Sequence, residues 1–193
     1  MSKPDKRDEI VRAALELIAE QGFHGSPMAE LAKRAGVGAG TIYRYFENKD
    51  VLIAELYREL EARIYPALLE GYSAERPVRE RFLQLGSALL SYFINHPLDF
   101  RYLEQFHNSP YGVECRRAKL FGEAGTGKGN TFRELFLDGI ATGEVKQLPL
   151  PVLFALSFGP LFSAARDQIL GFVTFDEELI ARTIAACWDA VRS

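Results

Sequence analysis

Residues 36–49, GVGAGTIYRYFENK, are the most informative segment of this 193-residue chain. The segment contains three glycines and three aromatic side chains but only two cationic ones. A glycine directly after a helical pattern favours a tight turn, and the stretch between Gly36 and Gly40 is too short for anything longer. We therefore predict a turn there, followed by a short helix that runs to about Phe46.

The preceding segment, SPMAELAKRAG at residues 26–36, has the pattern of another helix. Ser26 is typical of an N-cap, and Pro27 is typical of a first helical position. Two helices that cross closely need a small residue at the crossing, and Ala32 is that residue. They also need an apolar inner face. That inner face is expected to consist of Leu31, Val37, Ile42 and Phe46. The pattern predicts a helix-turn-helix, although a purely structural helical hairpin is an alternative interpretation.

The outer face of the predicted third helix indicates what this motif touches. At 100° per residue, Ile42 and Phe46 mark the buried side, and Arg44 points the opposite way. Gly40 shares the outer side and allows the backbone to approach a groove closely. Arginine can bind a guanine edge with two hydrogen bonds. Thr41 and Tyr43 flank this outer side, and their hydroxyl groups can bind phosphate oxygens.

A lysine at the start of the fourth helix is consistent with the same partner. Asn48 is predicted to cap that helix, so Lys49 lies in the first turn, where the helix dipole disfavours a cation. A phosphate bound against this helix end would explain the lysine. A tolerated surface lysine is the alternative.

Residues 8–55, with the string GFHGSPMAELAKRAGVGAGTIYRYFENKDVL, resemble the DNA-binding domain of the TetR/AcrR family of transcriptional regulators. The resemblance implies a homodimeric repressor that binds a palindromic double-stranded operator through its first three helices. It also implies a larger C-terminal domain that binds a small-molecule effector, with residues 1–47 and 48–193 as the two domains. The DNA-binding residues it implies are Ser26, Thr41, Tyr43, Arg44 and Lys49. Ala39, Gly40 and Tyr45 are further candidates for DNA binding because they lie in the same short helix.

Two positions depart from the family pattern. Gly38 stands where the family often has a serine cap, and Ala39 where a longer polar residue is frequent. Both changes remove side chains that could read bases, so we expect base discrimination to depend mainly on Arg44 and DNA shape readout to take a larger share. Additional contacts are expected from Tyr45 and from the basic arm, which comprises Lys3, Lys6 and Arg7.

The remaining chain also shows helical periodicity, and no stretch alternates like a strand, so the expected fold is all-α. Pro66 is expected to kink or interrupt the fourth helix. The helices predicted outside the helix-turn-helix cover 8–22, 49–72, 77–95, 97–108, about 113–121, 131–145, 151–170 and 176–192. Small residues among the large apolar ones in the last two segments favour close helix packing, and we expect 151–170 and 176–192 to form the dimer interface.

The effector site is less clearly marked. Most C-terminal aromatic residues are expected to be core, and six residues are candidates for effector contacts: Tyr102, Phe106, His107, Phe158, Phe162 and Arg166. Arg166 lies in an apolar run, where a buried arginine would need an anionic partner. Alternatively, Arg166 points to solvent or pairs across a dimer interface.

Other function classes find little support. The net charge of −3 gives no general nucleic-acid signature, so DNA binding must depend on where the charges lie. GEAGTGKG at residues 122–129 lacks the hydroxyl and preceding strand of a phosphate-binding loop. Cys115 and Cys187 fit no metal or redox spacing. No pair among Cys115 and the three histidines, His24, His96 and His107, has the spacing of a nucleophile and its base or of metal ligands, so no cofactor, metal site or enzymatic activity is expected.

No secretory signal or membrane span is expected, which predicts a cytoplasmic protein. The sequence leaves open whether DNA binding represses or activates. A helical small-molecule-binding protein with a vestigial helix-turn-helix is the alternative from another class.

Overall fold

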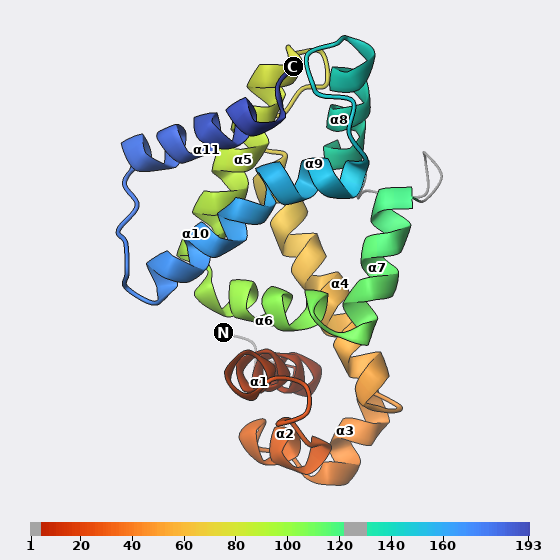
Figure 1. The fold of residues 1–193 in the computed structure, drawn as a ribbon. Coiled ribbons are helices and arrows are strands. Elements are labelled where there is room, and N and C mark those ends of the chain that lie inside the picture. The colour runs from red at the N-terminus through yellow and green to blue at the C-terminus, as the bar shows by residue number, and fades with distance from the viewer. Residues whose placement is uncertain (1–4, 122–130) are drawn as a thin grey trace. The chain divides into compact units, whose positions relative to one another are not determined.

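The computed structural model describes residues 5–121 and 131–193, and it confirms the all-α prediction (Figure 1). Within these residues no β-strand forms, and Val145 and Arg192 make an isolated bridge. The helices are α1 Lys6–Gln21, α2 Met28–Arg34, α3 Ala39–Tyr45, α4 Lys49–Leu68, α5 Val78–Asn95, α6 Pro97–His107, α7 Pro110–Phe121, α8 Thr131–Ala141, α9 Leu150–Ser157, α10 Gly159–Ile169 and α11 Glu177–Val191.

The chain forms two compact units. The N-terminal unit comprises Met1–Arg63 and Pro97–Val113, and the C-terminal unit comprises Ile64–His96 and Glu114–Ser193. By compactness, therefore, α6 and most of α4 belong with the first three helices. The expected functional boundary between residues 47 and 48 is a separate matter and stays a prediction.

In the N-terminal unit, the turn between α2 and α3 forms where the glycine pattern predicts it. Gly36 has φ +66°, a conformation that favours glycine because it lacks a Cβ. Its N–H donates to the carbonyl of Lys33 at 3.2 Å, and the N–H of Val37 donates to that of Ala32 at 3.0 Å. These two bonds satisfy carbonyls at the end of α2 and redirect the chain into α3.

Helix α6 is an integral part of the N-terminal unit, because it packs against α1. The ring of Phe106 on α6 stacks on Tyr57 of α4, with centroids 4.0 Å apart and planes 8° apart. Tyr102 is fully buried, and its hydroxyl donates to the carbonyl of Ile53 at 3.0 Å. Helix α6 therefore contributes large core side chains to the unit that carries the helix-turn-helix.

In the C-terminal unit, α5 packs against both α10 and α11, and α9 contacts α8, α10 and α11 (Figure 1). Gly86 makes the α5–α11 approach possible, since a Cβ there would lie 2.7 Å from a methyl group of Ile184. The core between these helices is an aromatic cluster that consists of Phe82, Phe132, Phe136, Phe154, Phe158 and Trp188.

Several helix predictions need correction, and the helix expected at 131–145 ends at Ala141. The segment 151–170 is two helices, α9 and α10, which meet at Phe158 and change direction there (Figure 1). Pro160 explains the break, because it has no N–H to donate and its ring crowds the preceding turn. Helix α7 begins at Pro110 instead of about residue 113, since proline suits a first turn. Pro66 does not interrupt α4, which ends two residues beyond it.

Candidate nucleic-acid interface

Helix α3 divides into a buried side and an exposed side. Ile42 is 0% exposed and Phe46 is 1% exposed, whereas Tyr43 is 54% exposed and Tyr45 is 40% exposed. Arg44 is also exposed. The predicted buried side is therefore confirmed, and an arginine and two phenols face away from it. Such side chains can bind base edges and phosphate oxygens.

The first turn of α3 carries mostly small side chains or none. Gly38 occupies the N-cap position, where no side chain caps the helix, and Ala39 is exposed. A Cβ added at Gly40 would meet nothing within 4 Å, so packing inside the chain does not require this glycine. The backbone at residues 38–40 is consequently open to close approach from outside, whereas the N–H of Thr41 already donates to the carbonyl of Gly38 at 2.8 Å. Thr41, at the edge of the same face, is half-buried.

The position of Lys49 at the start of α4 has an explanation inside the protein, in addition to the predicted phosphate contact. Asn48 caps the helix as expected, since its side-chain oxygen accepts the N–H of Val51 at 2.9 Å. Lys49 is half-buried, and its ammonium donates to the carbonyl of Phe23. Desolvation lowers the pKa of Lys49, and the nearby carboxylate of Asp50 offsets only part of this shift. Lys49 therefore ties the α1–α2 corner to α4, and two of its three N–H groups remain for another partner.

The predicted N-cap role of Ser26 is wrong. Pro27 occupies the N-cap position of α2, and no side chain caps that helix. Ser26 is 0% exposed, and its hydroxyl donates to the carbonyl of Gly22 at 2.7 Å. The hydroxyl satisfies a carbonyl left free at the end of α1, so the side chain presents no surface to a duplex in this conformation.

The basic arm is only partly available to DNA. Lys6 is exposed, whereas Lys3 lies outside the described residues. Arg7 is committed inside the N-terminal unit: its guanidinium donates to Glu59 at 2.6 Å and lies 5.7 Å from the centroid of the Phe46 ring. The hydrogen bond to Glu59 raises the pKa of Arg7, which opposing desolvation does not cancel. Arg7 therefore braces α1 against α4.

The six candidate effector residues do not form one cluster. Tyr102 and Phe106 are core residues of the N-terminal unit, and His107 is exposed there. Phe158 is 2% exposed within the aromatic cluster of the C-terminal unit. Phe162 is half-buried, with its ring 4.9 Å from that of Phe93. This agrees with the expectation that most C-terminal aromatic side chains serve packing.

The buried arginine of the C-terminal unit is Arg81, not Arg166. Arg166 is exposed, which agrees with the alternative that it points to solvent. Arg81 is 3% exposed, and it donates to Asp138 at 2.8 Å and to the hydroxyl of Tyr72 at 2.9 Å. The sequence contained a signal for this: Arg81 lies on the apolar stripe of α5, three residues after Val78.

The described residues were also considered as a membrane segment or a metal site, and neither is found among them. Among residues 5–121 and 131–193, no helix combines the length and apolar character required to cross a membrane. In the same residues no three His, Cys, Asp or Glu side chains cluster in a way that could hold a metal ion. The segment 122–129, considered above as a phosphate-binding loop, lies outside the described residues.

Comparison with known families and proteins gives a consistent result. Residues 10–56 match the family described as bacterial regulatory proteins, tetR family, and residues 77–192 match a tetracyclin repressor-like C-terminal domain. A curated relative, the fatty acid metabolism regulator protein of Bacillus subtilis, is 26% identical over 184 residues, which cover 94% of this chain and 93% of that protein.

Two solved structures extend the comparison. A TetR family protein from Vibrio parahaemolyticus is 33% identical, with a TM-score of 0.77 over 98% of this chain and 99% of that chain. The regulator FadR from Bacillus subtilis, solved in complex with stearoyl-CoA, has a TM-score of 0.70 at 22% identity, over 94% of this chain and 95% of that chain. At that identity the second likeness concerns the fold alone.

Proposed function

The chain belongs to the TetR family of transcriptional regulators, and from this premise we propose that it is a repressor whose α3 reads a palindromic operator. In this proposal residues 1–47 bind DNA, and residues 48–193 bind a small-molecule effector and dimerise. Effector binding lowers operator affinity through a coupling free energy between the two sites, typically about 1–3 kcal/mol.

The outer side of α3 is the observation that carries the DNA-binding part of the proposal. Tyr43 and Tyr45 are 54% and 40% exposed, although burying aromatic surface would stabilise the fold. Arg44 is exposed between them. These side chains are available to a groove, and the first turn, which has no side chains at Gly38 and Gly40, allows the backbone to approach closely. We assign base reading to Arg44, and phosphate contacts to Thr41, Tyr43 and Lys49.

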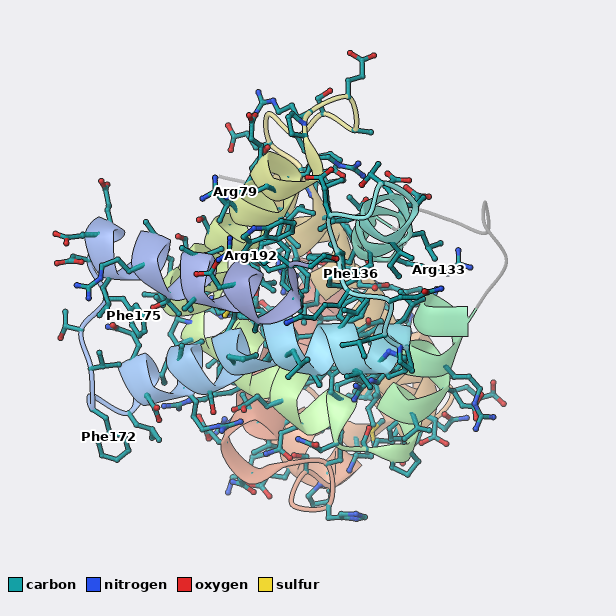
Figure 2. The ribbon with its side chains drawn as sticks, turned by 45° about the horizontal axis from the view of Figure 1, so that its top comes forward. Arg79, Arg133, Phe136, Phe172, Phe175 and Arg192 are labelled. Carbon is teal, nitrogen blue, oxygen red and sulfur yellow. The ribbon has the colours of Figure 1, made fainter. Side chains whose placement is uncertain are left out.

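Dimerisation is proposed through residues 151–170 and 176–192. The support is an unusual amount of exposed apolar surface in and between these segments: Leu156 is 41% exposed, Leu170 is 56% exposed and Phe172 is 78% exposed. Figure 2 shows the ring of Phe172 projecting from the loop between α10 and α11. Small exposed residues along the same helices, among them Ala155, Gly159, Ser163, Ala181 and Ala186, allow another helix to pack closely. A dimer would place two α3 helices about 34 Å apart, one turn of duplex.

The effector is proposed to be a mostly apolar small molecule bound in the C-terminal unit. The relative named as a fatty acid metabolism regulator and the FadR complex with stearoyl-CoA both concern molecules with long hydrocarbon chains. The interior of the C-terminal unit offers matching chemistry, because its core is the aromatic cluster around Phe136 and Phe158.

Operator selection tests the proposal. Duplexes bound by the wild-type protein are selected from a random library, and affinity for the selected and a scrambled duplex is then measured by fluorescence anisotropy at several salt concentrations. We expect two inverted half-sites one helical turn apart and a clear preference for the selected duplex. Equal, weak binding to both duplexes would instead favour a helical small-molecule-binding protein with a vestigial helix-turn-helix.

A further inference from the structure

Arg133, in the first turn of α8, has a buried nitrogen without a hydrogen-bond partner in the described part of the chain. Arg81 and Arg133 are the two arginines of the described C-terminal unit that are not exposed. Arg81 has two partners, Asp138 and Tyr72. By contrast, the Nε of Arg133 is fully buried and has no hydrogen-bond partner among the residues that the structure describes. A buried, unsatisfied donor on a charged group is unfavourable, so such a group in a native protein needs an explanation.

The acidic residues nearest in sequence do not supply that partner. Glu134 follows Arg133 directly, so it points about 100° away around α8, and it is exposed. Asp138 is the other acid on α8, and its carboxylate already accepts from Arg81. Arg133 therefore holds a positive charge that the described parts of α8 leave uncompensated.

The same helix carries two side chains of the aromatic cluster. Phe136 lies one turn further along α8, and Figure 2 shows Arg133 and Phe136 on the side of α8 nearer α9. The ring of Phe136 is 5.2 Å from that of Phe154 on α9, and the ring of Phe132, which directly precedes Arg133, is 4.7 Å from that of Phe158. A guanidinium with an unsatisfied donor, on the same helix as two rings of the aromatic cluster, matches a ligand with an anionic group at one end and a hydrocarbon body.

We propose that Arg133 binds the anionic group of the effector, and that the effector is an amphipathic anion whose carboxylate or phosphate oxygens accept from the guanidinium. This inference rests on the proposed function, because it assigns a chemical class to the effector of that same C-terminal unit. Neither a charge-free hydrocarbon nor a cation satisfies Arg133.

The test compares Arg133→Met with Arg79→Met, a control at an exposed arginine on α5 of the same unit (Figure 2). Calorimetry measures binding of three probes that share a twelve-carbon chain: dodecanoate, dodecanoyl-CoA and dodecanol. We expect the wild type to bind at least one of the two anions more tightly than the alcohol. Arg133→Met should weaken that anion at least tenfold, Arg79→Met should leave it within twofold, and neither change should affect the alcohol.

The two anions separate the two sources of negative charge: tighter binding of dodecanoate identifies a carboxylate, and tighter binding of dodecanoyl-CoA identifies phosphates. Thermal melting establishes that each variant is folded, and Arg133→Lys, which keeps the charge, should restore part of the affinity. The proposal is overturned if the wild type binds neither anion, if the alcohol binds as well as the anions, or if Arg133→Met binds the anions like the wild type.

Failure of the proposed function would look different. Arg133→Met should bind the selected operator with wild-type affinity in the absence of any probe, and only its release by the anion should be lost. If the wild type binds the anion but no operator, the regulator assignment is wrong while the role of Arg133 stands.

Discussion

The outer side of α3 and the Arg81 site in the C-terminal unit use the same pair of residue types for opposite purposes. On α3, Arg44 and Tyr43 lie exposed on the outer side of the helix. In the C-terminal unit, Arg81 is 3% exposed and donates to the hydroxyl of Tyr72 and to Asp138. An arginine beside a tyrosine therefore indicates neither function nor packing by itself. The two sites differ in whether other residues of the protein already accept hydrogen bonds from the guanidinium.

This contrast predicts that changes in the C-terminal unit reduce stability, whereas changes on α3 reduce DNA affinity. The largest effect is expected at Phe136, which is fully buried in the aromatic cluster. Phe136→Ala should lower the free energy of unfolding by about 3–5 kcal/mol, because it removes a large apolar side chain and leaves a cavity. Urea denaturation measures this. A loss below about 1 kcal/mol would show that the cluster is loosely packed.

The next effect concerns the Arg81 site itself. Asp138→Ala leaves the buried guanidinium with Tyr72 alone and should cost about 2–3 kcal/mol of unfolding free energy, less than a fully buried pair because Asp138 is half exposed. Asp189→Ala is the matched control, since it breaks an exposed pair with Arg192 and should change stability by less than about 0.5 kcal/mol. If both variants lost the same unfolding free energy, the buried Arg81–Asp138 pair would contribute no more to stability than the exposed Asp189–Arg192 pair.

On α3 the expected effect is on DNA binding. Arg44→Ala should cost about 1–3 kcal/mol of operator affinity per half-site and relax sequence preference, with unfolding free energy unchanged. Anisotropy with the selected and scrambled duplexes measures this, and Arg12→Ala, at an exposed position of α1, is the control.

Lys49→Ala tests whether phosphate contacts and base reading are made by different residues. It should weaken the selected and scrambled duplexes alike and flatten the salt dependence, because a phosphate contact carries no sequence information. It should also lower stability slightly, since the hydrogen bond to the carbonyl of Phe23 is lost. If Arg44→Ala and Lys49→Ala behaved identically on both duplexes, the assigned division between base reading and phosphate binding would be wrong.

The smallest effect concerns Tyr102, a buried phenol of the N-terminal unit. Burial raises its pKa well above the usual value, so the folded state keeps the proton while the unfolded state releases it near pH 10. Stability should therefore fall by about 1.4 kcal/mol per pH unit above about pH 10.

Tyr102→Phe should cost about 1 kcal/mol at pH 8 through loss of the hydrogen bond to Ile53. The variant should lack this alkaline decline, so its disadvantage should vanish near pH 11. Urea denaturation at both pH values measures the difference, and a disadvantage that stays constant with pH would contradict the prediction.

The helix-turn-helix was predictable because its signals are local. Gly36 adopts positive φ, Asn48 caps α4, and Ile42 and Phe46 face inward, as the pattern indicates. Each of these depends on residues within one or two helical turns. The family string at residues 8–55 is informative for the same reason, since it specifies one local motif.

Two of the errors concern partners that lie far away in the chain. Arg7 pairs with Glu59, 52 residues away, and Arg81 pairs with Asp138, 57 residues away. Ser26 is of a residue type that often caps helices, but its hydroxyl donates to the carbonyl of Gly22 instead. Sequence patterns show which side chains need partners without showing which partners they find.

Periodicity and helix-end residues were sufficient to establish an all-α chain with a DNA-binding motif, because backbone hydrogen bonds and side-chain direction in a helix are short-range properties. Tertiary packing was needed to show that α6 packs with α1, that Arg81 and not Arg166 is buried, and that the Nε of Arg133 is buried without a hydrogen-bond partner among the described residues. Burial and charge pairing depend on contacts between distant segments, which become visible only when the helices are packed together.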